Sequence, residues 1–115
     1  MKNIKVILSP DSKEVYVYLN KEAKNFKTEK SILRSINQKI EFIKENPQYG
    51  DPISKDKIPK EYKEKYGNIN LFRVELPNFW RMLYTLIEGD TKIEIIAFIL
   101  DIIDHKIYNK KFGYS

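Results

Sequence analysis

The sequence predicts an α+β fold: an N-terminal strand and a helical hairpin, then a three-stranded antiparallel meander and a short C-terminal helix. Three observations carry this prediction. A β-rich run occupies residues 4–8, two amphipathic helical patterns fill residues 10–45, and three strand-like runs lie between residues 69 and 103. The chain has 115 residues, of which 42% are apolar, enough for one modest core. We therefore expect a single domain that spans residues 1–115.

The first helix is predicted to follow the opening strand directly. Ser9 can cap it, and Pro10 suits its first turn. Spacings of 4, 4 and 3 place four apolar residues on one helical face: Val15, Leu19, Ala23 and Phe26. The run at residues 15–19 would also suit a strand, but the longer helical spacing favours the helix.

The second helix is predicted from residue 28 or 29 up to the pair Asn46-Pro47. Its apolar residues repeat at spacings of 4, 4 and 3: Ile32, Ile36, Ile40 and Ile43. Proline disfavours helical backbone at the residue before it, so the helix should end there. Two consecutive amphipathic helices with a short joint predict an αα-hairpin.

Residues 51–68 break the periodic pattern and are predicted to form a long loop. Pro52, Pro59 and Gly67 interrupt this stretch, and five lysines lie between residues 55 and 65. Apolar residues are interleaved with the lysines, which indicates that the loop is held against the body of the protein. A loop of this length in a small domain is usually functional or disordered.

Three strands are predicted after this stretch, at residues 69–76, 79–87 and 92–103. In the first strand, Phe72, Val74 and Leu76 alternate with Leu71, Arg73 and Glu75, as expected for a two-faced strand. Residues 88–91 suit a hairpin loop between the second and third strands. The third strand is apolar enough to be covered on both faces. Residues 105–112 can add one or two helical turns.

Composition excludes several classes of function. The chain has no cysteine and one histidine, so a disulfide scaffold, a thiol nucleophile and a multi-histidine metal site are impossible. Asp101 and Asp104 form only a weak metal-binding pattern, and we expect no metal and no cofactor. The apolar runs are too short to cross a membrane, and a signal-peptide core is lacking, so a soluble, cytoplasmic protein without a membrane partner is expected.

The charge favours a polyanionic partner. Lysine and arginine number 21 against 16 acidic residues, for a net charge of +5 and a pI near 9.3. Two basic places stand out: the lysine-rich stretch at residues 55–65 and the C-terminal tail from residue 105. Most single lysines only solvate a surface, so the three arginines are more informative.

Arg81 lies inside the apolar run at residues 79–84. A guanidinium in a strand is costly unless it faces solvent, a carboxylate or a bound anion. Glu75 or Glu94 could supply that carboxylate across the sheet, which would make Arg81 purely structural. His105 is the only side chain of a type that titrates near neutrality, and Tyr108 would share a helical face with it.

The order of elements resembles the RelE/ParE toxin superfamily, the small basic toxins of type II toxin–antitoxin modules. The resemblance rests on the strand at residues 71–76, the segment Trp80-Arg81-Met82-Leu83-Tyr84 and the closing segment at residues 104–108. It covers nearly the whole chain by topology, although its motifs are short. The pattern of an aromatic residue, arginine, two apolar residues and tyrosine is most similar to the ribonuclease branch.

The resemblance implies roles for individual residues. Arg81 matches the arginine that neutralises the scissile phosphate. Tyr108 matches a C-terminal tyrosine that acts as a general base or stacks on a base, and His105 occupies the region of a catalytic histidine or arginine. Arg73 stands at the first of two strand lysines of the RelE type. Glu75 replaces the second lysine, a departure from that pattern.

The sequence therefore predicts a metal-independent endoribonuclease toxin that cleaves mRNA, with the ribosome as a setting implied by the resemblance. A 2′-hydroxyl attack on the phosphate needs only proton transfer and charge stabilisation. The residues expected to bind RNA are Arg73, Lys57, Lys60, Lys63, Lys65, Lys110, Lys111 and Trp80, and Tyr62 and Tyr66 are further candidates to stack on bases. The alternatives are a non-hydrolytic ParE-type inhibitor of DNA gyrase and an inactive, partner-binding member of the fold. An acidic cognate antitoxin is the expected partner, bound by the lysine-rich stretch.

Overall fold

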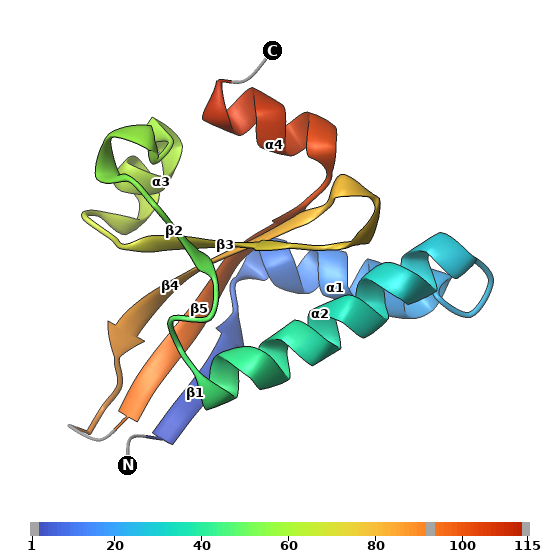
Figure 1. The fold of residues 1–115 in the computed structure, drawn as a ribbon, viewed down its shortest axis with the longest axis horizontal. Helices are drawn as coiled ribbons and strands as arrows, with labels where there is room; N and C mark the ends of the chain where they lie inside the picture. The colour runs from blue at the N-terminus through green and yellow to red at the C-terminus, as the bar shows by residue number, and fades with distance from the viewer. Residues whose placement is uncertain (1–2, 92–93, 114–115) are drawn as a thin grey trace.

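A five-stranded sheet forms the centre of the computed structural model, which describes residues 3–91 and 94–113 (Figure 1). The strands are β1 (Asn3–Leu8), β2 (Asp51–Ile53), β3 (Leu71–Glu75), β4 (Arg81–Glu88) and β5 (Glu94–Ile103). Their order in the sheet is β1-β5-β4-β3-β2. The helices are α1 (Pro10–Glu22), α2 (Lys27–Glu45), α3 (Lys60–Tyr66) and α4 (His105–Phe112).

The α+β prediction is confirmed, and β3, β4 and β5 form the antiparallel meander that the sequence indicates. The N-terminal strand, for which the sequence predicts no partner, pairs in parallel with β5, so the sheet is mixed. Residue pattern alone does not reveal which sheet edge an N-terminal strand joins, since that choice depends on where the helical hairpin packs. Lys92 and Ile93, predicted to begin the third strand, lie outside the described residues.

The prediction of a long loop at residues 51–68 is also wrong. This stretch contains β2, a 3-10 turn (Lys55–Lys57) and α3. Pro52 sits in an edge strand, Pro59 directly precedes α3, and Gly67, with φ of +80°, follows its last residue. These residues therefore mark the boundaries of short elements, as proline and glycine commonly do. The predicted attachment to the body is present, because Ile58 and Tyr62 are buried.

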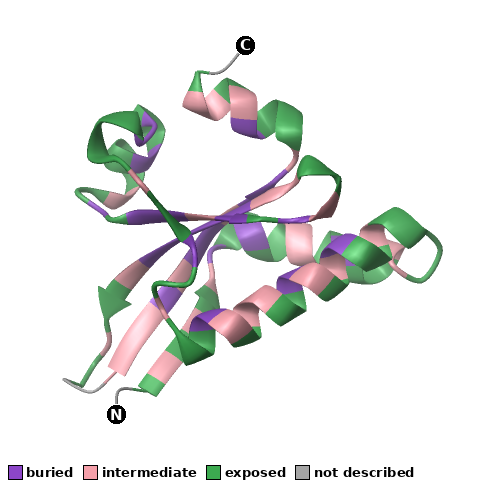
Figure 2. Cartoon of the chain, viewed as in Figure 1, coloured by how far each residue is buried: buried purple, intermediate pink, exposed green. Residues whose placement is uncertain are grey.

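The two faces of the sheet carry separate apolar clusters (Figure 2). One face packs against α1 and α2, with Leu19, Ile36 and Tyr84 fully buried. The other face is covered by α3 and α4 (Figure 1). The predicted face of α1 is right for Leu19 but wrong for Phe26, which is 54% exposed because the helix ends at Glu22. None of the helices in the described parts of the chain is long and apolar enough to cross a membrane.

A β-bulge in β5 decides which residues face α3 and α4. Leu83 pairs with Asp101 and Tyr84 pairs with Ile99, so Leu100 is the extra residue between the two pairs. An extra residue shifts the alternation of the side chains that follow it. Leu100 and Ile103 pack under α3 and α4, whereas Ile99 packs against the helical hairpin.

Two buried serines at the start of α1 hold this bulge. The Ser9 hydroxyl donates a hydrogen bond of 2.7 Å to the Leu100 carbonyl, and its oxygen accepts one of 3.0 Å from the Ser12 amide as the predicted helix cap. The Ser12 hydroxyl donates a hydrogen bond of 2.9 Å to the Ile99 carbonyl. Both serines are fully buried, so no solvent replaces these bonds if they are lost.

We expect Ser9→Ala to lower the free energy of unfolding by about 1–3 kcal/mol, because it removes both the helix cap and the donor to the Leu100 carbonyl. Ser31→Ala, at an exposed position of α2, is the matched control and should change the free energy by less than about 0.5 kcal/mol. Urea denaturation measures both values. Equal effects of the two substitutions would show that the serine bonds do not hold the bulge.

Candidate functional site

Three residues predicted to form the site converge under α4. Arg73 of β3 donates a hydrogen bond of 3.0 Å from Nη1 to the hydroxyl of Tyr108, and the Arg81 guanidinium lies 5.1 Å from the centre of the Tyr108 ring. Arg73 alternates with Phe72 and Val74 as predicted, and because those two residues pack against the helical hairpin, Arg73 lies on the opposite face. Tyr108 is 3% exposed and stacks on Phe112, with the ring centres 4.4 Å apart. Two guanidinium groups therefore meet one buried tyrosine.

Each of these arginines has a carboxylate nearby, but at long range. Nη2 of Arg73 lies 3.9 Å from Asp51, and Nε of Arg81 lies 3.9 Å from Glu75. These distances exceed that of a hydrogen bond. The structural alternative for Arg81 is thus present only as a weak pair with Glu75, and Glu94 lies 3.6 Å from Lys5 instead.

The two guanidinium groups also retain unused hydrogen-bonding capacity. The Nε atoms of Arg73 and Arg81 are both buried, and neither has a hydrogen-bond partner among the described residues. The hydrogen bond to the Tyr108 hydroxyl is the largest influence that raises the pKa of Arg73 above its ordinary value. Buried donors on groups that stay charged are the expected state of a site that binds an anion.

A cavity of about 160 Å³ adjoins this cluster. It is lined by Asp51, Pro52, Ile53, Ser54, Lys57, Arg73, Tyr108 and Phe112. We call it the reaction cavity. Lys57 and Arg73 give it two positive charges against the single carboxylate of Asp51, so it favours an anionic group such as a phosphate. The sequence does not predict that residues 51–54 line this cavity, because their pattern indicates part of a loop.

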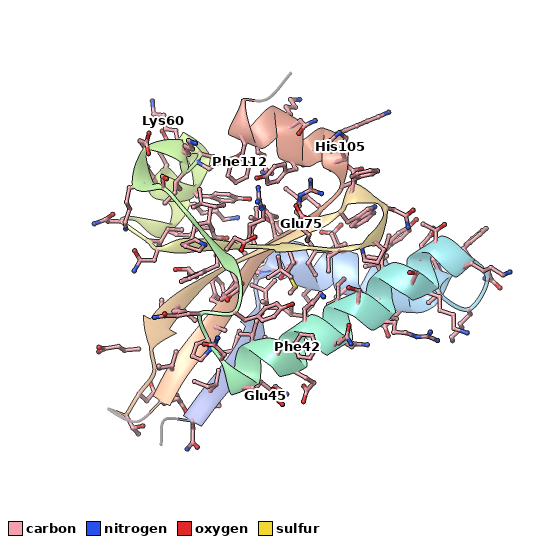
Figure 3. The ribbon with its side chains drawn as sticks, in the orientation of Figure 1. Phe42, Glu45, Lys60, Glu75, His105 and Phe112 are labelled. Atoms are coloured by element: carbon pink, nitrogen blue, oxygen red, sulfur yellow. The ribbon has the colours of Figure 1, made fainter. Side chains whose placement is uncertain are left out.

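His105 does not join this cluster through its contacts. It begins α4, whereas Phe112 ends it, and the two side chains lie at opposite ends of the helix (Figure 3). The His105 ring is exposed, with its centre 5.6 Å from that of Phe79 and its Nε2 atom 3.2 Å from the Asn109 amide nitrogen. His105 therefore lies at the solvent side of α4.

The residues predicted to bind RNA lie in several different surroundings. Lys57 lines the reaction cavity, and Lys60, Lys63 and Lys110 are exposed on α3 and α4. The half-buried Trp80 packs against the core on the helical-hairpin side. Lys65 lies 3.0 Å from Asp11 and so links α3 to α1. Of the tyrosines considered for base stacking, Tyr62 is 3% exposed and its ring is not accessible to a base.

Lys111 belongs to a partly buried network that fastens α4 to the rest of the protein. Its ammonium lies 3.1 Å from Glu61 of α3 and 3.8 Å from Asp101 of β5. The Tyr62 hydroxyl donates a hydrogen bond of 2.5 Å to the same Asp101 carboxylate. We call these four residues the α4 clamp. In the sequence, Asp101 stands out only as part of a weak metal-binding pattern, and nothing there indicates its contacts with Tyr62 and Lys111.

Burial raises the pKa of both Tyr62 and Asp101 above their ordinary values. The hydrogen bond to Asp101 adds to the increase for Tyr62. For Asp101, the Tyr62 hydroxyl and Lys111 offset part of the increase. The clamp thus holds a carboxylate that is costly to ionise in the folded protein.

We expect Asp101→Asn to alter how stability depends on pH. The raised pKa means that folded protein binds the Asp101 proton more tightly than unfolded protein does. The stability that this proton contributes is therefore present below the ordinary aspartate pKa of about 4 and is lost as pH rises through the folded value. The free energy of unfolding of the original chain should fall relative to that of Asp101→Asn over this window. Parallel stability curves from pH 3.5 to 7 would contradict the assignment.

Comparison of the chain with protein-family models, curated proteins and solved structures finds no match. The resemblance to the RelE/ParE superfamily therefore stays a prediction that rests on the residues quoted above. What the structure adds is independent of that resemblance. Two partly buried guanidinium groups, a buried tyrosine and a cationic cavity occupy one face of the sheet.

Proposed function

We propose that this chain is a metal-independent endoribonuclease toxin of the RelE type. The observation that carries the proposal is the convergence of Arg73 and Arg81 on Tyr108 beside the reaction cavity. In RNA, the neighbouring 2′-hydroxyl is itself the nucleophile, so the protein needs only to stabilise charge and move protons. The bond from phosphorus to the 5′-oxygen breaks, which leaves a 2′,3′-cyclic phosphate and a 5′-hydroxyl.

The arginines supply the charge stabilisation. The pentacoordinate phosphorane carries more negative charge than the phosphate diester, and guanidinium groups bind its oxygens through paired N–H donors. The Arg81 side chain is only 14% exposed, so water screens its charge weakly. The phosphate would lie in the reaction cavity between Lys57 and Arg73.

Tyr108 is the nearest proton carrier to these cations. Its hydroxyl accepts the hydrogen bond from Arg73, so a positive charge lies beside the oxygen that must be a phenolate before it can take the 2′-hydroxyl proton and become a phenol. His105 is the second candidate and would protonate the leaving 5′-oxygen. Its position at the solvent side of α4 requires the RNA to pass along that helix.

Glu75 is the main departure from the RelE pattern, and the geometry gives it a role compatible with cleavage. At 3.9 Å from Arg81 it is a weak counterion, 64% exposed, that a phosphate can displace. The carboxylate would orient Arg81 in the free protein and leave this pair when RNA binds.

The proposed partners follow from the exposed cations. Lys60 and Lys63 on α3 lie close in sequence to Lys57 of the reaction cavity, and all three are exposed. An acidic antitoxin segment bound to this surface would cover the cavity and exclude mRNA, with or without the ribosome. The antitoxin segment would then replace the mRNA on this surface.

We expect Arg73→Ala and Arg81→Ala to lower RNA cleavage at least 10²-fold, because each removes a donor to the phosphorane. The chain offers a matched control in Arg34→Ala, an exposed position on α2 that should leave cleavage unchanged. Cleavage of single-stranded RNA in the presence of a metal chelator measures all three variants. The melting temperature of Arg81→Ala should stay within a few degrees of that of the original chain. Unfolding of this variant would support the structural alternative instead.

Tyr108→Phe and His105→Ala separate the two proton carriers. If the Tyr108 hydroxyl is the base, its removal should lower cleavage roughly 10²–10⁴-fold while stacking on Phe112 is retained. If His105 is the acid, His105→Ala should also lower cleavage by a factor in this range. Full activity of His105→Ala would remove His105 from the mechanism.

A further inference from the structure

A second cavity, of about 300 Å³, lies on the edge of β3 and is lined by Lys39, Tyr49, Gly50, Asp51, Arg73, Val74 and Glu75. We propose that this cavity binds a single guanine base of the RNA substrate, an inference that rests on the proposed function. Arg73 and Asp51 line both this cavity and the reaction cavity, so the two adjoin. A nucleotide whose phosphate contacts Arg73 can therefore place its base here.

The charge of this cavity suits a base better than a phosphate. Lys39 and Arg73 are balanced by Asp51 and Glu75, whereas the reaction cavity has two cations and one carboxylate. Two carboxylates repel a phosphate, but they accept hydrogen bonds from the N–H groups of a base. The neutral cavity and the cationic cavity thus match the two parts of a nucleotide.

Tyr49 provides an aromatic surface for the base. Its side chain is 39% exposed, and its ring centre lies 5.3 Å from that of Phe42 and 6.0 Å from the Lys39 ammonium. Proteins that recognise single-stranded RNA stack unpaired bases on such rings and read their Watson–Crick edges with polar side chains. Phe42 and Lys39 thus hold the ring in place, while Tyr49 stays exposed enough to meet a base.

The polar groups of the cavity select guanine. Its Watson–Crick edge presents two adjacent donors, N1–H and N2–H₂, beside the acceptor O6. A carboxylate accepts both donors at once, and an ammonium such as that of Lys39 can donate to O6. Adenine, cytosine and uracil each present a single donor group on this edge, so each would leave part of a carboxylate unpaired.

The cavity is held in shape before any ligand binds. The Gly50 amide donates a hydrogen bond of 2.9 Å to the Tyr84 hydroxyl, which donates one of 2.7 Å to the Pro47 carbonyl. A Cβ atom at Gly50 would lie 2.9 Å from the Tyr84 ring and 3.1 Å from the Arg73 carbonyl oxygen, so only glycine permits this approach. The segment that carries Tyr49 and Asp51 is thus fixed against the sheet, which lowers the entropy lost on binding.

Titration of the intact chain with 3′-GMP, 3′-AMP, 3′-CMP and 3′-UMP, followed by calorimetry, tests the proposal. We expect 3′-GMP to bind roughly ten-fold or more tightly than each of the others, as a bidentate base contact provides. Glu75→Gln and Asp51→Asn should each reduce the ratio of GMP to AMP affinity. This ratio cancels the general effect of removing a negative charge. Glu45→Gln, at an exposed position of α2 that does not line this cavity, is the control and should keep the ratio.

Equal binding of the four nucleotides, or a guanine preference that survives in both variants, would overturn the proposal. The outcome is separable from that of the proposed function. RNA cleavage without guanine preference would leave the ribonuclease in place and remove the base site. Preferential 3′-GMP binding by a chain that cleaves no RNA would support the base site and reject the ribonuclease.

Discussion

The Asp101 carboxylate determines the geometry of the face on which the candidate site lies. It accepts the Tyr62 hydroxyl from α3 and lies 3.8 Å from the Lys111 ammonium of α4. Lys111 is three residues beyond Tyr108, or about one helical turn, so the clamp fixes the part of α4 that carries the tyrosine. Arg73 and Arg81 meet Tyr108 only because α4 is held at this position. Asp101 itself lies next to the bulge, whose carbonyls are bound by Ser9 and Ser12.

The energies of the charged contacts on this face separate structural from functional groups. A buried carboxylate is destabilising unless its oxygens are paired, and Asp101 has both a short hydrogen bond and a cation. Breaking one of these contacts would leave a charge uncompensated. The pairs of Arg73 with Asp51 and of Arg81 with Glu75 are long and partly exposed, and such pairs are worth about 0–1 kcal/mol. The contacts of the α4 clamp are therefore explained by their contribution to stability. The weak pairs of Arg73 and Arg81 contribute too little to explain why two arginines lie beneath α4.

The sequence was sufficient to predict the main elements because their periodicities are strong. Isoleucines at helical spacing mark α2, and alternation in β3 correctly separates Arg73 from Phe72 and Val74. The resemblance to the RelE/ParE superfamily singles out Arg73, Arg81 and Tyr108, whereas the sequence pattern alone does not predict that they meet. Contacts between residues that are distant in the sequence could not be predicted from these periodicities. The parallel pairing of β1 with β5, the pairing of β2 with β3 and the hydrogen bond between Tyr62 and Asp101 join residues 18 or more positions apart.

The surface charge, like the distant contacts, could not be predicted from the order of residues along the chain. The five lysines at residues 55–65 indicate a strongly cationic surface when counted along the chain. In three dimensions, Lys55 donates to the Ile69 carbonyl, Lys60 lies 3.8 Å from Glu64, and Lys65 lies 3.0 Å from Asp11. Lys57 is the member of this stretch that lines the reaction cavity. The positive charge of this face is therefore described less by the net charge of +5 than by a few cations beside the two cavities, with Arg73 common to both.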